Sequence, residues 1–231
     1  DFCLSRGLGD VYKRQELDLS YIIRQCVETV DGKSISSQTC FEKANEMISS
    51  FGIKPKEVAS LLSASKIDGV LDSRLYKEVI NLHETGFSNI NRLIDSITTK
   101  PSKEGDSSIV NYDLLQKAKE WHKKGISEDW VSNYAYSLNS QNLDAKAYDL
   151  VIEYYQSGFK DGHITNLIYA NSNLDDISLS EFKDAVFELK KLGLDNDKII
   201  TALHSIGLPN GWGNPNFKIT KRNLFISVSY T

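Results

Sequence analysis

The sequence predicts an all-α fold of about five tandem helix-turn-helix hairpins with a period of 33–39 residues, stacked as a short solenoid or irregular helical array. Three observations predict this class. Glycine recurs at that spacing, apolar residues hold fixed places around it, and further apolar residues follow at helical intervals. No segment before Phe217 alternates convincingly as a strand does, and Phe217–Ile226 is the first that does.

The recurring glycines predict where helices end. They follow one another at spacings of 34, 39, 33 and 35 residues, as Gly52, Gly86, Gly125, Gly158 and Gly193. The next residue is always apolar: Ile53, Phe87, Ile126, Phe159 or Leu194. The residue four places earlier is also apolar: Ile48, Leu82, Trp121, Tyr154 or Leu189. A Schellman-type C-cap needs this pattern, because glycine adopts the left-handed conformation and the following side chain packs back on the helix.

Helix starts follow from the same register. The first helices of the units are expected to begin near Cys40, Leu75, Asp113, Ala147 and Glu181. Ser178 and Glu181 form a capping-box pattern. The second helices follow the glycines, with N-caps expected at Ser88, Ser127 and Asp195. Matching turns at Val30-Asp31-Gly32 and Ile67-Asp68-Gly69 make Leu17–Val27 the expected second helix of an earlier unit.

Both ends of the chain resemble translated sequencing-adapter sequence. Residues 5–15 match one adapter element, and residues 228–231 match the reverse complement of part of the same element. We therefore expect residues 1–15 and 228–231 to be foreign, 16–206 to be the helical repeat domain, and 207–227 to be a non-helical cap, a linker or the start of a lost domain. The natural protein is expected to be longer, so the sequence predicts no localisation.

Composition excludes several classes of function. The 231 residues are 40% hydrophobic and 25% charged, and the net charge is −4. This mildly acidic balance argues against nucleic-acid binding, and no apolar run in this fragment is long enough to span a membrane. Motifs for phosphate loops, dinucleotide binding, zinc proteases and serine hydrolases are absent from the sequence. No enzymatic activity is predicted, and no catalytic residue is assigned.

The pattern resembles an α-solenoid of helical hairpins, and its features around residues 174–182 resemble a degenerate EF-hand. The EF-hand resemblance implies calcium binding. In the loop over residues 102–113, Ser102, Glu104, Asp106 and Asp113 occupy the ligand positions, although Ser107 stands where the motif has glycine. Glu104, Asp106 and Asp113 are therefore the candidate metal ligands, and calcium is the only cofactor considered.

Two cysteines of the repeat region, Cys26 and Cys40, fall near helical core positions. They are expected to be small buried hydrophobic residues, and a disulfide between them is open if their helices touch.

Candidate partner-binding residues come from comparing equivalent positions of the units. Five residues after each glycine the side chains are polar except Trp130, and three residues before it Tyr155 stands among Ser49, His83, His122 and Lys190. An aromatic residue in a polar column is either exposed, as binding anchors are, or packed locally. The sequence thus predicts a non-catalytic protein-interaction scaffold with an unknown protein partner, with a degenerate EF-hand-type calcium-responsive module as the alternative.

Overall fold

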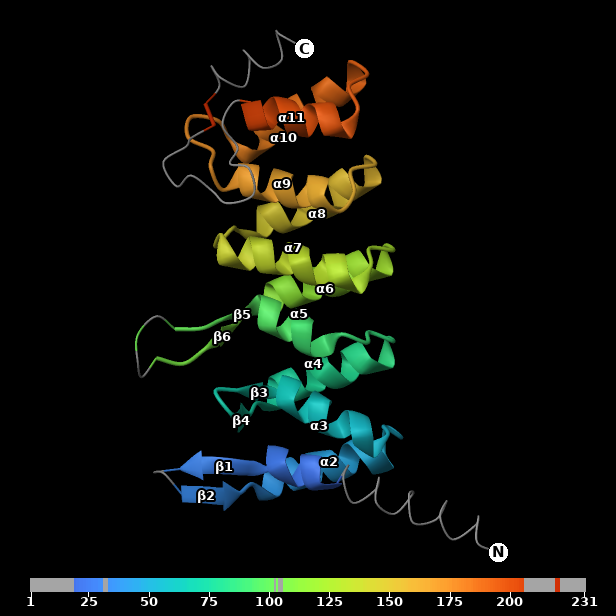
Figure 1. Ribbon diagram of the computed structural model, residues 1–231, viewed down its shortest axis with the longest axis vertical. Coiled ribbons are helices and arrows are strands. Elements are labelled where there is room, and N and C mark those ends of the chain that lie inside the picture. Colours follow the sequence, from blue (N-terminus) through green and yellow to red (C-terminus); the bar gives the residue numbers. More distant parts are fainter. Residues whose placement is uncertain (1–18, 31–32, 102, 104–105, 206–218, 221–231) are drawn as a thin grey trace, which may run out of the picture. The chain divides into compact units, whose positions relative to one another are not determined.

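The computed structural model describes residues 19–30, 33–101, 103, 106–205 and 219–220. Most of them lie in helices joined by short connections, which confirms the predicted all-α class (Figure 1). The chain divides into two compact units. Unit 1 comprises Asp1–Asp95 and Lys100–Val110, and unit 2 comprises Ser96–Thr99 and Asn111–Thr231. Within the described residues, no helix has both the length and the apolar character that crossing a membrane requires.

Unit 1 begins with a short helix over residues 19–25, which agrees with the expected earlier helix. Its further helices are α2 (Gln38–Ser49), α3 (Pro55–Ala64), α4 (Ser73–Glu84) and the larger part of α5 (Ile90–Ile97). Helix α3 packs against both α2 and α4. Leucine, isoleucine and valine side chains fill the space between these helices, as at Val58, Leu62, Leu75 and Val79.

Unit 2 contains consecutive helix pairs. They are α6 (Tyr112–Lys123) with α7 (Glu128–Ser140), α8 (Ala145–Gln156) with α9 (Gly162–Asn171), and α10 (Leu179–Lys191) with α11 (Asn196–Ser205). Helix α8 also packs on α6, while α9 packs on both α7 and α11. We call α6, α8 and α10 the first-helix layer and α7, α9 and α11 the second-helix layer. The turns inside the three pairs lie on the same side of unit 2 (Figure 1).

Each first helix begins at a residue whose side chain caps it. The capping oxygen accepts a hydrogen bond from a backbone N–H of the first turn, and the residues are Ser37, Asp72, Asn111, Asp144 and Ser178. Such caps satisfy N–H groups that have no partner inside the helix. Ser178 and Glu181 form the predicted capping box. Of the N-caps expected for second helices, Asp195 accepts from the Lys198 N–H at 2.8 Å, whereas Ser127 forms no such bond.

The five recurring glycines all have positive φ, between 64° at Gly52 and 95° at Gly125. At Gly86, Gly125, Gly158 and Gly193 the glycine N–H bonds to the carbonyl three residues earlier, and the next N–H bonds to the carbonyl five residues earlier. This pair of bonds defines the Schellman motif. Around Gly52 the turn is one residue longer, because the Ile53 N–H reaches the carbonyl of Met47. Met47 is accordingly buried there, and Ile48 is half-buried.

Short β-hairpins connect successive helix pairs. The prediction of no strand before Phe217 was wrong at these places. Strand β1 (Val27–Val30) pairs with β2 (Lys33–Ser36), and β3 (Lys66–Ile67) pairs with β4 (Val70–Leu71), both antiparallel. Asp68 and Gly69 have φ of 51° and 83°. Asp-Gly at positive φ is the two-residue turn that matches the twist of a hairpin. Two-residue strands β5 (Thr98–Thr99) and β6 (Ile109–Val110) also occur.

Cys26 and Cys40 form a disulfide with a Cα–Cα distance of 5.2 Å. Both residues are fully buried, as expected, and the bond settles the alternative that the sequence left open. The β1–β2 hairpin brings them together, because it returns the chain so that the Ser37 N–H bonds to the Cys26 carbonyl at 2.7 Å. The disulfide therefore ties the end of the 19–25 helix to the start of α2.

Several predicted segments lie outside the described residues. These are the adapter-like ends at 1–15 and 228–231 and almost all of the expected tail at 207–227, including the expected strand Phe217–Ile226. Ile219 is described and fully buried. It forms a parallel β-bridge with Leu174 in the connection between α9 and α10.

Candidate interaction surface

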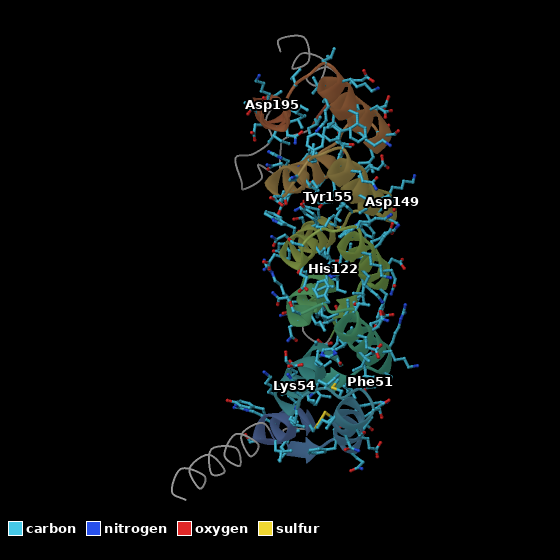
Figure 2. All side chains as sticks on the ribbon, turned by 90° about the vertical axis from the view of Figure 1, so that its right-hand side faces the viewer. Phe51, Lys54, His122, Asp149, Tyr155 and Asp195 are labelled. Atoms are coloured by element: carbon cyan, nitrogen blue, oxygen red, sulfur yellow. A yellow bond between two sulfur atoms is a disulfide. The ribbon has the colours of Figure 1, made fainter. Side chains whose placement is uncertain are left out.

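Tyr155 lies near the end of α8 and reaches back to the turn of the preceding helix pair. Its hydroxyl donates a hydrogen bond of 3.2 Å to the carbonyl of Gly125, and its side chain is half-buried. Figure 2 views the edge of unit 2 on which this turn lies and labels Tyr155 above His122. The structure therefore places this predicted partner-binding residue in a contact between successive helix pairs.

Lys190 occupies the equivalent position in the next helix pair and makes an equivalent contact. Its Nζ atom lies 4.3 Å from the centre of the Phe159 ring and donates to Asn196 Oδ1 at 2.6 Å. Asn196 in turn donates to the Gly158 carbonyl at 2.8 Å. Burial lowers the pKa of Lys190 below its ordinary value. The position three residues before each glycine thus serves to join the helix pairs of unit 2 at these two turns.

Trp130, the other predicted partner-binding residue, lies in the first turn of α7 and is half-buried. Its ring stacks at a tilt on Tyr134, with 5.8 Å between the ring centres. Tyr134 is buried and donates to the Asp161 carbonyl at 3.3 Å, which joins α7 to the start of α9. Burial raises the pKa of Tyr134. Trp130 therefore packs locally on Tyr134 while its side chain remains partly exposed.

The sequence comparison missed a repeated polar pattern on α7 and α9. Eight residues after Gly125 and Gly158 stand Asn133 and Asn166, and eleven residues after them stand two tyrosines, Tyr136 and Tyr169. Residues three apart share one side of a helix, so each Asn–Tyr pair lies on one side of its helix, and Ser140 continues that side at the end of α7. We call these five residues the α7–α9 face. Comparing the columns at eight and eleven residues after each glycine would have found it.

Within the α7–α9 face Tyr136 and Ser140 are exposed, while the face borders buried residues of the same helices such as Ser137 and Ala170. The Tyr136 side chain is 58% exposed, and Asn133, Asn166 and Tyr169 are half-buried. Among the described residues, the side-chain polar groups of Tyr136, Asn166 and Tyr169 have no hydrogen-bond partner. The two helices pack directly on each other, so the equivalent residues form neighbouring rows.

Charge separates this face from the first-helix layer. No Asp, Glu, Lys or Arg occurs in residues 130–143 or 164–174. The first-helix layer is instead linked by ion pairs, from Lys117 to Asp149 at 2.6 Å and from Lys183 to Glu153 at 3.0 Å. The hydrogen bond that Lys117 donates to Asp149 raises the pKa of Lys117. In Figure 2 Asp149 of the first-helix layer and Asp195 at the start of α11 lie on opposite sides of the edge.

The candidate calcium loop is only partly described. Glu104 lies outside the described residues, while Asp106 and Asp113 are both exposed. Asp113 lies in the first turn of α6. Within the described part of the chain, no group of three or more His, Cys, Asp or Glu side chains is arranged to hold a metal ion.

Unit 1 has a separate hollow of about 540 Å³ between α2 and α4. Tyr76 lies at its base, where its hydroxyl donates to Glu46 at 3.2 Å and Lys43 lies 4.7 Å from the ring centre. Burial raises the pKa of Tyr76, and the hydrogen bond from Lys43 lowers that of Glu46. The Glu46 carboxylate is therefore paired with both Lys43 and Tyr76, and the lining of the hollow mixes charged, polar and apolar side chains.

Comparison of the chain with protein-family models, with curated proteins and with solved structures gives no match. The function must therefore be argued from the residues and their geometry.

Proposed function

We propose that this chain is a non-catalytic protein-interaction scaffold built of helical repeats, and that the α7–α9 face receives its protein partner. The single observation that carries the proposal is the recurrence of asparagine and tyrosine at equivalent positions of two adjacent helices, where every one of these side chains is at least partly exposed. Tyrosine and tryptophan are enriched among the residues that contribute most to binding energy. Trp130 lies at one end of the same surface and extends it.

The composition of the face supports this role. A helix surface that only needs to remain soluble is usually covered by charged side chains, as the first-helix layer is. Interfaces are instead depleted in Lys, Glu and Asp and enriched in aromatic residues. Because asparagine amides both donate and accept hydrogen bonds, they can satisfy the polar groups of a partner that covers them.

Photo-crosslinking from the two layers tests the proposal. Benzoylphenylalanine would replace Tyr136 in one version of the full chain and Gln156 in another. Gln156 is exposed at the end of α8, in the first-helix layer, and is the matched control. We expect one protein, identified by mass spectrometry, to crosslink from position 136 and not from position 156.

Two further changes sharpen this experiment. Asn166→Ala should remove the adduct formed at position 136 while leaving the circular dichroism spectrum unchanged, since the side chain lies on the solvent side of α9. Trp130→Ala should weaken the same adduct. Equal crosslinking from both layers, or no adduct from either, would contradict the proposed function.

A further inference from the structure

We propose that Ile219 is an intramolecular anchor that competes with the protein partner for the end of the α7–α9 face nearest Asn173. The inference rests on the proposed function and adds a regulation of the same site. It follows from the way Ile219 is bound, from its nearness to Tyr169, and from the charge of the sequence around it.

Both polar groups of the Ile219 backbone are bound to the connection between α9 and α10. The Ile219 N–H donates to the Asn173 carbonyl at 2.7 Å, and the Ile219 carbonyl accepts from the Asp175 N–H at 3.1 Å. These bonds form the parallel bridge to Leu174, and the Ile219 side chain is fully buried. A residue that is buried and bonded at both backbone groups holds its part of the chain against unit 2.

This pairing differs from the connections between helix pairs in unit 1. Those connections close on themselves, through four residue pairs between β1 and β2 and two between β3 and β4. The α9–α10 connection pairs instead with a residue from beyond α11, and among the described residues the bridge is a single pair. Elements held by few contacts open at a lower free energy than the rest of a fold. We therefore expect the anchor to open and close while unit 2 remains folded.

The anchor lies next to one residue of the α7–α9 face. The Asn173 side chain donates to the Tyr169 carbonyl at 2.8 Å, and four residues of helix span only about 6 Å. A specific protein interface covers about 800 Å² on each partner. A partner of that size centred on Asn166 and Tyr169 therefore reaches the position that Ile219 occupies.

The sequence around Ile219 explains why the anchor and the partner exclude each other. Lys218, Lys221 and Arg222 are basic, whereas residues 130–143 and 164–174 contain no Asp, Glu, Lys or Arg. A partner that matches the uncharged face would have to cover this basic sequence wherever Ile219 remains anchored. Covering a charged group without an opposite charge is costly. Release of Ile219 removes that cost.

Competition acts in both directions. If the partner binds only when the anchor is open, its apparent affinity is reduced by the fraction of molecules in the open state. By linkage, the partner must shift the anchor toward the open state by the same factor. An anchor that is open in about one tenth of the molecules would change the affinity of the partner by about tenfold.

Substitutions at Ile219 test the effect of the anchor on the partner. Each is made in the full chain with benzoylphenylalanine at position 136, and the adduct is measured below saturation with the crosslinked protein. Ile219→Ala removes the buried apolar side chain, and Ile219→Pro also removes the N–H that donates to Asn173. We expect the adduct to increase about threefold and about tenfold, respectively. Val186→Ala is the matched control, because it removes part of a fully buried side chain of α10, and it should leave the adduct unchanged.

Amide hydrogen exchange on the unaltered chain tests the effect of the partner on the anchor. The N–H groups of Ile219 and Asp175 report the anchor, and the Ile199 N–H, which donates to the Asp195 carbonyl at 3.1 Å, is the reference. Saturation with the protein that crosslinks from position 136 should speed exchange at Ile219 and Asp175 about tenfold. Exchange at Ile199 should not change.

The outcomes separate this inference from the proposed function. An adduct that stays unchanged in both Ile219 variants, while faster exchange at Asp175 shows that the anchor is released, would overturn the inference. Slower exchange at Ile219 in the presence of the partner would also overturn it, because Ile219 would then belong to the interface. In both cases the adduct from position 136 leaves the proposed function standing.

Two remaining outcomes are also decisive. If no version of the chain gives an adduct, the proposed function fails and this inference fails with it. If circular dichroism shows that Ile219→Pro does not fold, the exchange experiment on the unaltered chain decides the inference.

Discussion

The first-helix and second-helix layers of unit 2 bury similar apolar stripes but present different outer surfaces. Helix α6 exposes Asp113, Glu120 and Lys123 along its length, whereas α7 exposes Asp129 in its first turn and then only the uncharged Tyr136 and Ser140. The large buried aromatic side chains lie mainly in the first-helix layer, at Trp121, Tyr154 and Phe182. The two layers therefore have different roles. The first-helix layer supplies much of the core and a charged, solvated exterior, and the second-helix layer supplies the surface proposed for binding.

The largest expected effect comes from removing a buried aromatic side chain. Trp121→Ala should lower the free energy of unfolding by about 3–5 kcal/mol, because the side chain is fully buried and leaves a cavity. Tyr136→Ala, on the solvent side of α7, should change it by no more than about 0.5 kcal/mol. Urea denaturation followed by circular dichroism measures both. Similar losses in the two variants would show that Tyr136 belongs to the core and would remove the contrast between the layers.

A smaller effect is expected at the turn that joins the layers. Gly158 has φ of 85°, so Gly158→Ala should cost about 1–2 kcal/mol in the left-handed conformation. Gly162 is the matched control. It lies at the start of α9 without positive φ and has open space around its Cα, so Gly162→Ala should stabilise the fold by about 0.4–1 kcal/mol. Melting temperatures that move in the same direction for both variants would contradict this account of the turn.

Added salt should weaken the electrostatic contacts of the first-helix layer more than it weakens binding to the second-helix layer. Lys117→Ala removes the ion pair with Asp149 and should cost at most about 1 kcal/mol, since both groups are partly exposed. That cost should shrink as sodium chloride is raised. Crosslinking of the partner from position 136 should be nearly independent of salt, because residues 130–143 and 164–174 contain no Asp, Glu, Lys or Arg. A steep loss of that adduct with salt would place the binding on charged residues instead.

Calcium is expected to have the smallest effect. If Glu104, Asp106 and Asp113 bound calcium, the folded state would be stabilised by mass action and the melting temperature would rise. We expect melts in calcium and in chelator to coincide. A clear rise with calcium would favour the EF-hand alternative and identify the loop before α6 as a functional site.

The ends of the helices were largely predictable because their signals are local. The glycine after each first helix must adopt positive φ, and the apolar residue that follows must pack back on the helix. Both residue types therefore recur at fixed positions in the sequence. The capping residues Ser37, Asp72, Asn111 and Asp144 leave a similar trace 14 or 15 residues before each glycine. They can be recognised once the glycine register is known.

The β-hairpins and the disulfide were harder to predict for a physical reason. Strands of two to four residues are too short to show an alternating pattern, although Asp68-Gly69 between apolar residues is a hairpin signal. The pairing of Cys26 with Cys40 depends on the β1–β2 hairpin, which sequence spacing alone does not reveal.

The candidate site was predicted only in part. Trp130 and Tyr155 were predicted because each is aromatic where the equivalent residues of the other helix pairs are polar or charged. The structure shows that Tyr155 contacts the preceding turn, so an exception can also arise from packing. The same comparison looked for exceptions and so did not identify the residues that repeat, which are Asn133, Tyr136, Asn166 and Tyr169.

The most direct test of the central claim is a titration of the ¹⁵N-labelled full chain with the protein that crosslinks from position 136, followed by amide chemical shifts. The account predicts that the largest shifts cluster on α7 and α9 around Asn133, Tyr136, Asn166 and Tyr169, while α6 and α8 change little. Shifts centred on the charged first-helix layer, or none on α7 and α9 at a saturating concentration of that protein, would contradict it.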